Sequence, residues 1–420
     1  MKRRSQAICA VLGLVALLVP RSAAAYSVLS HEAIIDSLWD GSIQPLLVLR
    51  FPAATPEELQ KAHAYCYGGA IIQDAGYYPF GGKFFSDLLH YVRSGDFVLA
   101  LIHESQNLNE YAFALGAVAH YAADNEGHPN ATNRAVAMMY PKLRRKFGLI
   151  VNYGDDPLAH IRTEFSFDVV QVAQNHYAPE AYHDFIGFEV AEEVLKRAFL
   201  DTYSIDLDKA FHDLALGIGS YRFSVGSILP TMTKVAWARN KNEIIKSSPG
   251  ITRKKFLYNL SRSSYHKEWG TNYERPGWWA RFLAWVIEIL PKIGPLRELQ
   301  IPAPTQATQQ LFMASFNATI TRAKELYAAQ RLGKLRMPNE NLDLGLPPAA
   351  GSYPLSDNAY AKLVGILADG RFQGISPELR QNVLNYYADP AKPVATRQKP
   401  EEWAKLQAEL NDLKGLRPGQ

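Results

Sequence analysis

Cysteine is scarce in this chain, which has only two among its 420 residues, Cys9 and Cys66. Cys9 lies in an N-terminal segment that we expect to be removed, so Cys66 would have no partner for an intramolecular disulfide. A disulfide framework of the kind that stabilises small secreted domains is therefore excluded. We expect Cys66 to be a small buried side chain.

An excess of charge of either sign is also missing from the expected mature chain. The full sequence has 45 Lys and Arg residues against 41 Asp and Glu residues. Four of the cations, Lys2, Arg3, Arg4 and Arg21, lie in the first 25 residues, and without them the two signs balance. A global positive field that would gather nucleic acid is not expected, although a local basic patch remains compatible with this composition.

The apolar run near the N-terminus is too short to span a bilayer comfortably, since a spanning helix needs about 20 residues. The run covers residues 7–20, follows the basic residues 2–4 and leads into three alanines at 23–25. This order is typical of a signal peptide that is cut after a small residue. The sequence therefore predicts export, to the periplasm or the medium, and a mature chain that starts at Tyr26.

Helical periodicity runs through almost all of the remaining sequence, and few segments show the alternation of a strand. The sequence Thr55-Pro56-Glu57-Glu58 has the cap, the first-turn proline and the acidic residues of a helix start. One long helix is expected over residues 96–124 and another over 157–174. The predicted fold class is all-α.

Stretches rich in proline, glycine and serine, at residues 247–250 and 346–351, indicate two boundaries. They divide the chain into a signal peptide at 1–25, a catalytic domain at 26–250, a helical extension at 251–345 and accessory C-terminal helices at 346–420.

A short apolar segment at residues 278–290 contains Trp278, Trp279 and Trp285, three of the seven tryptophans. Two interpretations stay open. The segment is either a helix buried against the main domain or an interfacial helix that touches a membrane surface through its tryptophans. The second interpretation favours a lipid substrate.

Histidines and acidic residues recur at helical spacing in the first half of the chain. His120 and Asp124 are four residues apart, as are His160 and Glu164, so each pair shares one helical face. Either pair alone is weak evidence. Both lie in an alanine-rich, largely uncharged context, where buried imidazoles and carboxylates need a partner that a metal ion provides. His128 is expected on a loop beyond the helix.

The complete series resembles the zinc-dependent phospholipase C family, whose fold is shared by single-strand-specific zinc nucleases. The resemblance covers about residues 26–250, and every place in the family's pattern is filled in order by Tyr26, His31, Asp74, His90, His120, Asp124, His128, His160 and Glu164.

The resemblance implies three zinc ions. One would be held by Asp74, His90, His120 and Asp124, a second by His128, His160 and Glu164, and a third by Tyr26 and His31 with Asp124 as a bridge. Tyr26 stands where the family usually has tryptophan. The expected ligands there are the free α-amino nitrogen and the carbonyl oxygen, which any residue supplies once the signal peptide is cut.

The implied activity is phosphodiester hydrolysis by a zinc-bridging hydroxide, with Asp74 as the candidate to orient or deprotonate the water. Phospholipid, cleaved on the glycerol side, is the expected substrate because the mature charge is neutral and because the nucleases tend to have Asp at the place of Glu164. A single-strand-preferring nuclease is the alternative, since Tyr77, Tyr78, Tyr91 and Tyr121 could stack on bases. A third alternative is a non-catalytic protein that binds zinc or membranes. The oligomeric state is not predicted.

Overall fold

The computed structural model describes residues 27–78, 81–174, 188–211, 213–223 and 304–416, together with the single positions 237, 241, 242, 245, 252 and 253. Within these residues the secondary structure is helical, and the sole β-type pairing is an isolated bridge between Asn341 and Leu346. The predicted all-α class is confirmed. Tyr26 and the tryptophan segment 278–290 lie outside the described residues.

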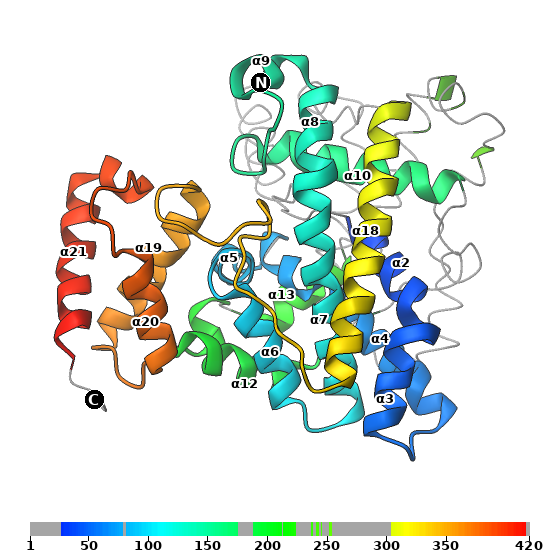
Figure 1. The fold of residues 1–420 in the computed structure, drawn as a ribbon, viewed down its shortest axis with the longest axis horizontal. Coiled ribbons are helices and arrows are strands. Elements are labelled where there is room, and N and C mark those ends of the chain that lie inside the picture. The colour runs from blue at the N-terminus through cyan, green and yellow to red at the C-terminus, as the bar shows by residue number, and fades with distance from the viewer. Residues whose placement is uncertain are drawn as a thin grey trace, which may run out of the picture.

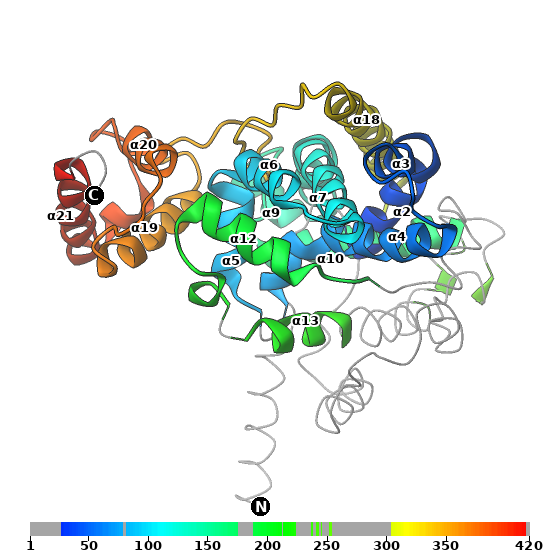
Figure 2. The same cartoon turned by 90° about the horizontal axis from the view of Figure 1, so that it is seen from below.

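The helices of the first part of the chain surround a central helix, α7 (Figures 1 and 2). Their bounds are α2 Val28–Leu38, η1 Trp39–Ile43, α3 Gln44–Arg50, α4 Pro56–Ile71, η2 Ile72–Tyr77, α5 Lys83–Tyr91, α6 Ser94–Glu104, α7 Leu108–Gly127, η3 His128–Thr132, α8 Asn133–Met139, α9 Pro141–Phe147, α10 Pro157–Gln174, α12 Glu192–Tyr203, η4 Leu207–Lys209 and α13 Leu214–Phe223.

The later described helices fall into two places in Figure 1: α18 lies along α7, and the others form a separate lobe beside α5 and α12. Their bounds are α18 Gln306–Arg331, α19 Pro354–Asp369, α20 Pro377–Tyr386, η8 Ala395–Gln398 and α21 Pro400–Gly415.

Helix α7 is buried along most of its length because its neighbours approach it closely. A β-carbon on Gly69 of α4 would lie 1.8 Å from the carbonyl oxygen of Phe113, and one on Gly116 of α7 would lie 2.0 Å from that of Cys66. Glycine is therefore required where α4 and α7 touch. Cys66 is buried at this contact, as predicted.

The predicted helix over residues 96–124 is wrong in one respect, because the chain breaks between α6 and α7. Asn107 ends the break: its side chain accepts a hydrogen bond from the backbone N–H of Glu110 and caps α7. The predicted start at Thr55 is confirmed, since Thr55 and Glu58 form a reciprocal capping box.

The segment at 332–353, which joins α18 to α19, runs back over the helices of the first part of the chain (Figure 1). Glu340 accepts a hydrogen bond through its carbonyl from Ser94 Oγ at 2.6 Å, and the backbone N–H of Leu342 donates to the carbonyl of His90 at 3.0 Å. Among the described helices, none is both long and apolar enough to cross a membrane.

Candidate metal centre

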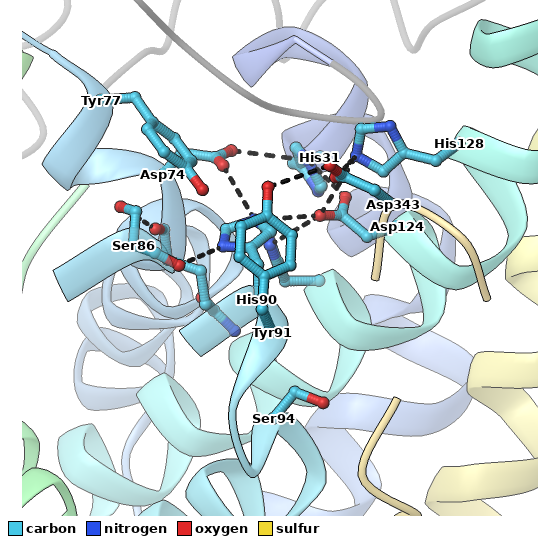
Figure 3. A network of polar contacts seen from close by, with 12 residues as sticks. His31, Asp74, Tyr77, Ser86, His90, Tyr91, Ser94, Asp124, His128 and Asp343 are labelled. Atoms are coloured by element: carbon cyan, nitrogen blue, oxygen red, sulfur yellow. Dashed lines mark hydrogen bonds and ion pairs between the residues drawn. The ribbon is translucent and has the colours of Figure 1, made fainter. Parts of the chain in front are cut away.

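Eight of the nine predicted site residues lie in the described part of the chain, and all eight are buried. They come from six elements, α7 and five others. The eight are His31 on α2, Asp74 on η2, His90 on α5, His120 and Asp124 on α7, His128 at the start of η3, and His160 and Glu164 on α10. Figure 3 shows five of the eight converging: His31, Asp74, His90, Asp124 and His128. The ninth, Tyr26, immediately precedes the first described residue, Ser27.

His128 differs from its predicted position on a loop. The chain stays helical beyond α7 and passes through the π-helical turn η3 into α8. His128 therefore lies one turn after Asp124, and its Nε2 is 3.7 Å from Asp124 Oδ2. Because the helix is continuous, the side chains of His120, Asp124 and His128, each one turn after the last, lie on the same face and contact one region.

The first group of candidate ligands is formed by Asp74, His90 and His120, with Asp124 beside them. His90 Nε2 lies 3.4 Å from Asp74 Oδ1 and 3.2 Å from Asp124 Oδ2, and His120 Nε2 also lies 3.2 Å from Asp124 Oδ2. Ligand atoms on one tetrahedral zinc, with bonds of 2.0–2.2 Å, are separated by roughly 3.3–3.6 Å. The group therefore has the spacing of a zinc site.

The second group is formed by His128, His160 and Glu164. His160 Nδ1 lies 2.7 Å from Glu164 Oε1, one helical turn away on α10. The His128 and His160 rings are stacked, with centroids 5.1 Å apart.

The third group joins His31 to His120 and Asp124. His31 Nε2 lies 3.7 Å from Asp124 Oδ1, whereas Asp124 Oδ2 faces the other histidines. The two oxygens of Asp124 therefore point to different groups, which is the arrangement of a bridging carboxylate. The α-amino group of Tyr26, the expected further ligand here, lies outside the described residues.

Hydrogen bonds on the far side of three rings fix which nitrogen faces the centre. His90 Nδ1 donates to the carbonyl of Ser86 at 2.8 Å, and His120 Nδ1 donates to that of Ala70 at 2.9 Å. In His160 the roles of the two ring nitrogens are exchanged, because Nε2 makes the outer hydrogen bond, at 2.8 Å from the side-chain oxygen of Asn133, and Nδ1 faces the centre. Such outer partners orient metal-binding imidazoles and set their tautomers.

The nitrogens left facing the centre are buried and have no hydrogen-bond partner among the described residues. They are His90 Nε2, His120 Nε2 and His160 Nδ1, and the carboxylate atoms Asp74 Oδ1, Asp124 Oδ1, Asp124 Oδ2 and Glu164 Oε1 share this state. Buried polar atoms normally have a partner, and leaving one without costs about 1–3 kcal/mol. A cluster of such atoms, all of zinc-ligand type, fits a metal centre.

Electrostatics support the same interpretation. Burial raises the pKa of Glu164 well above its usual range, and the nearby Asp74 and Asp124 raise it further. Burial, with help from His120, lowers the pKa of His31 to about 3, and burial and His128 lower that of His160. The imidazoles of His31 and His160 are thus neutral, as metal ligands must be. Burial opposes a rise in the pKa of His90 and His120, but contacts with Asp124 and Asp74 raise that of His90, and contact with Asp124 raises that of His120. The carboxylates therefore hold protons on these two rings at the place where dications would otherwise supply the positive charge.

One acidic residue at the centre was missed by the sequence analysis. Asp343 is buried, and its Oδ1 lies 3.4 Å from His128 Nε2 (Figure 3). It belongs to segment 332–353, beyond the predicted catalytic domain. No local spacing in the sequence connects Asp343 to a histidine, so only the tertiary structure could reveal it.

The fold and the site together define an all-α protein with buried groups of side chains that could hold metal ions. The family model of zinc-dependent phospholipase C matches residues 30–213, which confirms the resemblance inferred from the sequence over this part of the chain. No curated protein and no solved structure gives a significant match to the chain. The family and the ligand groups support a zinc-dependent hydrolase acting on phosphodiesters.

Proposed function

We propose that this chain is an exported phospholipase C that uses three zinc ions to hydrolyse the glycerol-side phosphodiester bond of phospholipids. The observation that carries the proposal is the position of Asp124, which faces His31 with one oxygen and His90, His120 and His128 with the other. One carboxylate thus connects all three ligand groups.

The substrate's negative charge makes dications necessary at this site. A phosphodiester approaching the centre meets the buried carboxylates of Asp74, Asp124, Glu164 and Asp343. These would repel it strongly in a medium of low dielectric constant. Bound zinc would supply the compensating charge and would lower the pKa of water to ~7.

The protein's own residues would orient the reactants. Asp74 Oδ1 is buried and has no hydrogen-bond partner among the described residues, while lying 3.4 Å from His90 Nε2. We assign to the Asp74 carboxylate, which would also be a ligand of the first zinc ion, the orientation of the attacking water or the acceptance of its proton. Substitution of Asp74 should then lower kcat more than it raises KM.

Phospholipid is favoured over nucleic acid by the positions of the tyrosines. Of the four candidate tyrosines, Tyr78 is half-buried and packs against the core. Tyr77, Tyr91 and Tyr121 are buried, and the hydroxyls of the last two donate to Asp343 and Glu340. These rings therefore belong to the interior of the protein and offer no exposed face on which bases could stack. Trp278, Trp279 and Trp285 remain a proposed membrane contact.

The test uses the mature protein, starting at Tyr26, with phosphatidylcholine and single-stranded DNA as parallel substrates. We expect phosphocholine release that stops with a chelator and returns with zinc, and release that is roughly a thousandfold slower in an Asp124→Asn variant. Nucleotide release would favour the nuclease instead. Release of neither product, with zinc bound, would favour the non-catalytic alternative.

A second experiment addresses the third zinc ion. A form with one extra alanine before Tyr26 has an amide in place of the α-amine, and an amide nitrogen has no basic lone pair to offer a metal. We expect this form to bind one zinc fewer than the mature chain. Full zinc content and full activity would show that the N-terminal amine is not a ligand.

A further inference from the structure

We propose that Asp343 is a ligand of the metal ion held by His128, His160 and Glu164, and that segment 332–353 thereby belongs to the catalytic unit. This inference rests on the proposed zinc binding. It adds a residue from outside the part of the chain that matches the family, which ends at residue 213.

The spacing of Asp343 from the neighbouring ring is that of two ligands on one ion. Asp343 Oδ1 lies 3.4 Å from His128 Nε2, the same distance that separates Asp74 Oδ1 from His90 Nε2 in the first group. Zinc bonds of 2.0–2.2 Å in a tetrahedral arrangement give roughly this separation.

The two oxygens of Asp343 have different environments. Oδ2 accepts hydrogen bonds from the hydroxyls of Tyr91, at 2.9 Å, and Tyr353. Oδ1 is buried, has no hydrogen-bond partner among the described residues and faces the centre. Hydrogen bonding on one side of a carboxylate leaves the other oxygen oriented for a metal, as is typical of ligating carboxylates.

The backbone of Asp343 is held to the same helices that carry the ligands. The side-chain nitrogen of Asn133 donates to the carbonyl of Asp343 at 2.8 Å, and the side-chain oxygen of Asn133 accepts from His160 Nε2. Asn341 Oδ1 accepts from the backbone N–H of Asp343 at 3.0 Å. One amide, that of Asn133, therefore positions both His160 and Asp343.

Charge gives an independent reason for a cation at this place. Among the described residues, the sole basic group within ion-pair distance of Asp343 is the imidazole of His128. A fully buried carboxylate without a cation is strongly unfavourable. A metal ion bound by His128 would compensate Asp343 directly.

The experiment compares Asp343→Asn with a matched control, Asp357→Asn. Asp357 is also a buried carboxylate of the C-terminal region, but its partners are Tyr386 and the backbone N–H groups of Gly351 and Ala395. Zinc content is measured across a series of chelator-buffered free zinc concentrations, and cobalt-substituted protein gives the absorption spectrum of the metal sites.

We expect Asp343→Asn to weaken one zinc site by about tenfold or more and to change the cobalt spectrum, while Asp357→Asn keeps both. Tyr353→Phe, which removes one hydrogen bond to Oδ2 and spares Oδ1, should weaken the same site to a smaller extent and serves if Asp343→Asn does not fold. Wild-type zinc affinity and spectrum in the Asp343 and Tyr353 variants would overturn the assignment. Absence of zinc from the wild-type protein would instead overturn the proposed function.

A different observation supports a second inference, at the surface formed by α9 and the residues after it. Residues 141–150 contain four exposed cations and no acidic residue, and two aliphatic side chains follow, Leu149 and Ile150, which are 68% and 55% exposed. The cations are Lys142, Arg144, Arg145 and Lys146.

We infer that this α9 surface binds to membranes that contain anionic lipid. Basic residues are attracted to anionic headgroups, and exposed aliphatic side chains gain by entering the interface. Phe147 and Leu143 of the same segment are half-buried and pack on Val136 and Ala159. This leaves no exposed aromatic ring for stacking, so a lipid surface fits better than nucleic acid.

Sedimentation with vesicles tests this surface separately from catalysis, using short incubations of the holoenzyme. We expect binding to vesicles of phosphatidylcholine with phosphatidylglycerol, weakened by salt, and about thirtyfold weaker for Arg144→Gln with Arg145→Gln. Lys405→Gln with Lys414→Gln on α21 changes the net charge equally and should bind as wild type. Equal binding by both double variants, or binding of single-stranded DNA in place of vesicles, would overturn the inference.

Discussion

The two sides of the metal centre are built differently. On one side, His90 and His120 are fixed by main-chain carbonyls, those of Ser86 and Ala70. On the other side, His160 is fixed by the side chain of Asn133, and His128 faces Asp343. The positions of His90 and His120 depend on how the backbone folds. The positions of His160 and His128 depend on the side chains of Asn133 and Asp343, each of which can be removed by one substitution. The second side is therefore the one that mutation can test most directly.

The largest expected effect comes from the residue that both sides share. Asp124→Asn keeps the shape of the side chain but removes the charge that faces His31, His90 and His128. Zinc should be lost from more than one site, and hydrolysis should fall by roughly a thousandfold, because metal ions contribute several kcal/mol to such transition states. Zinc content and kcat/KM measure this. Retention of full zinc would show that Asp124 is not a bridge.

Substitution of Asn133 should separate the two sides. Asn133→Ala removes the partner of His160 and one hydrogen bond to Asp343, without touching His90 or His120. We expect a loss of about 10–100-fold in the affinity of one zinc site, because outer partners of metal ligands contribute this much. Competition with a chelator measures the affinity. An equal weakening of every site would show that the two sides are not independent.

Zinc removal should destabilise the protein more at pH 7.5 than at pH 5.5. Burial, the first cause in each case, raises the pKa of Asp74 and Glu164 in the metal-free protein. At these two groups the folded state binds protons more tightly than the unfolded state, and the same holds at His90 and His120, whose pKa values contacts with Asp124 raise against the effect of burial. Metal-free stability therefore falls at these four groups as pH rises, and the lowered pKa values of His31 and His160 oppose this fall only below about pH 6.5. Protons also compete with zinc for the ligands at low pH. Thermal unfolding with and without zinc should therefore show the larger rise in Tm at pH 7.5; a larger rise at pH 5.5 would contradict this.

The sequence predicted the parts of the centre that local geometry determines. His120 with Asp124, and His160 with Glu164, follow from helical spacing, and both pairs lie as expected on α7 and α10. His31, Asp74 and His90 were found through the family resemblance, because their convergence depends on tertiary packing.

Two other features could not be read from the sequence. Asn133 and Asp343, which touch each other, are 210 residues apart in the chain. A contact at that separation has no periodicity to reveal it. His128 was expected on a loop because Gly127 and Pro129 flank it, yet a π-helical turn accommodates both and keeps the helix continuous. Glycine and proline signal a boundary, but the structure shows only a local widening of the helix.

The smallest expected effect concerns Asp168, which connects α10, the helix of His160 and Glu164, to α2. Asp168 lies on α10, one turn beyond Glu164, and its carboxylate accepts hydrogen bonds from the backbone N–H groups of Leu29 and Ser30 at 3.0 and 3.1 Å. It therefore caps α2, the helix that carries His31. Asp168→Ala should remove an acceptor of the Leu29 N–H and of the Ser30 hydroxyl, which also donates to this carboxylate, whereas the Ser30 N–H keeps its hydrogen bond to the carbonyl of Ser27. We expect the free energy of unfolding to fall by about 2 kcal/mol.

The pH dependence of this loss distinguishes the carboxylate from a simple packing effect. Burial raises the pKa of Asp168 to about 6, although the hydrogen bonds from Ser30 and Leu29 oppose that rise. The wild-type protein therefore loses stability at this group as pH rises from about 4 to 6, and the variant does not. The difference in unfolding free energy between the two proteins should be larger at pH 5 than at pH 7.5. Denaturant titrations at both values measure it, and a difference that stays constant with pH would assign the effect to packing alone.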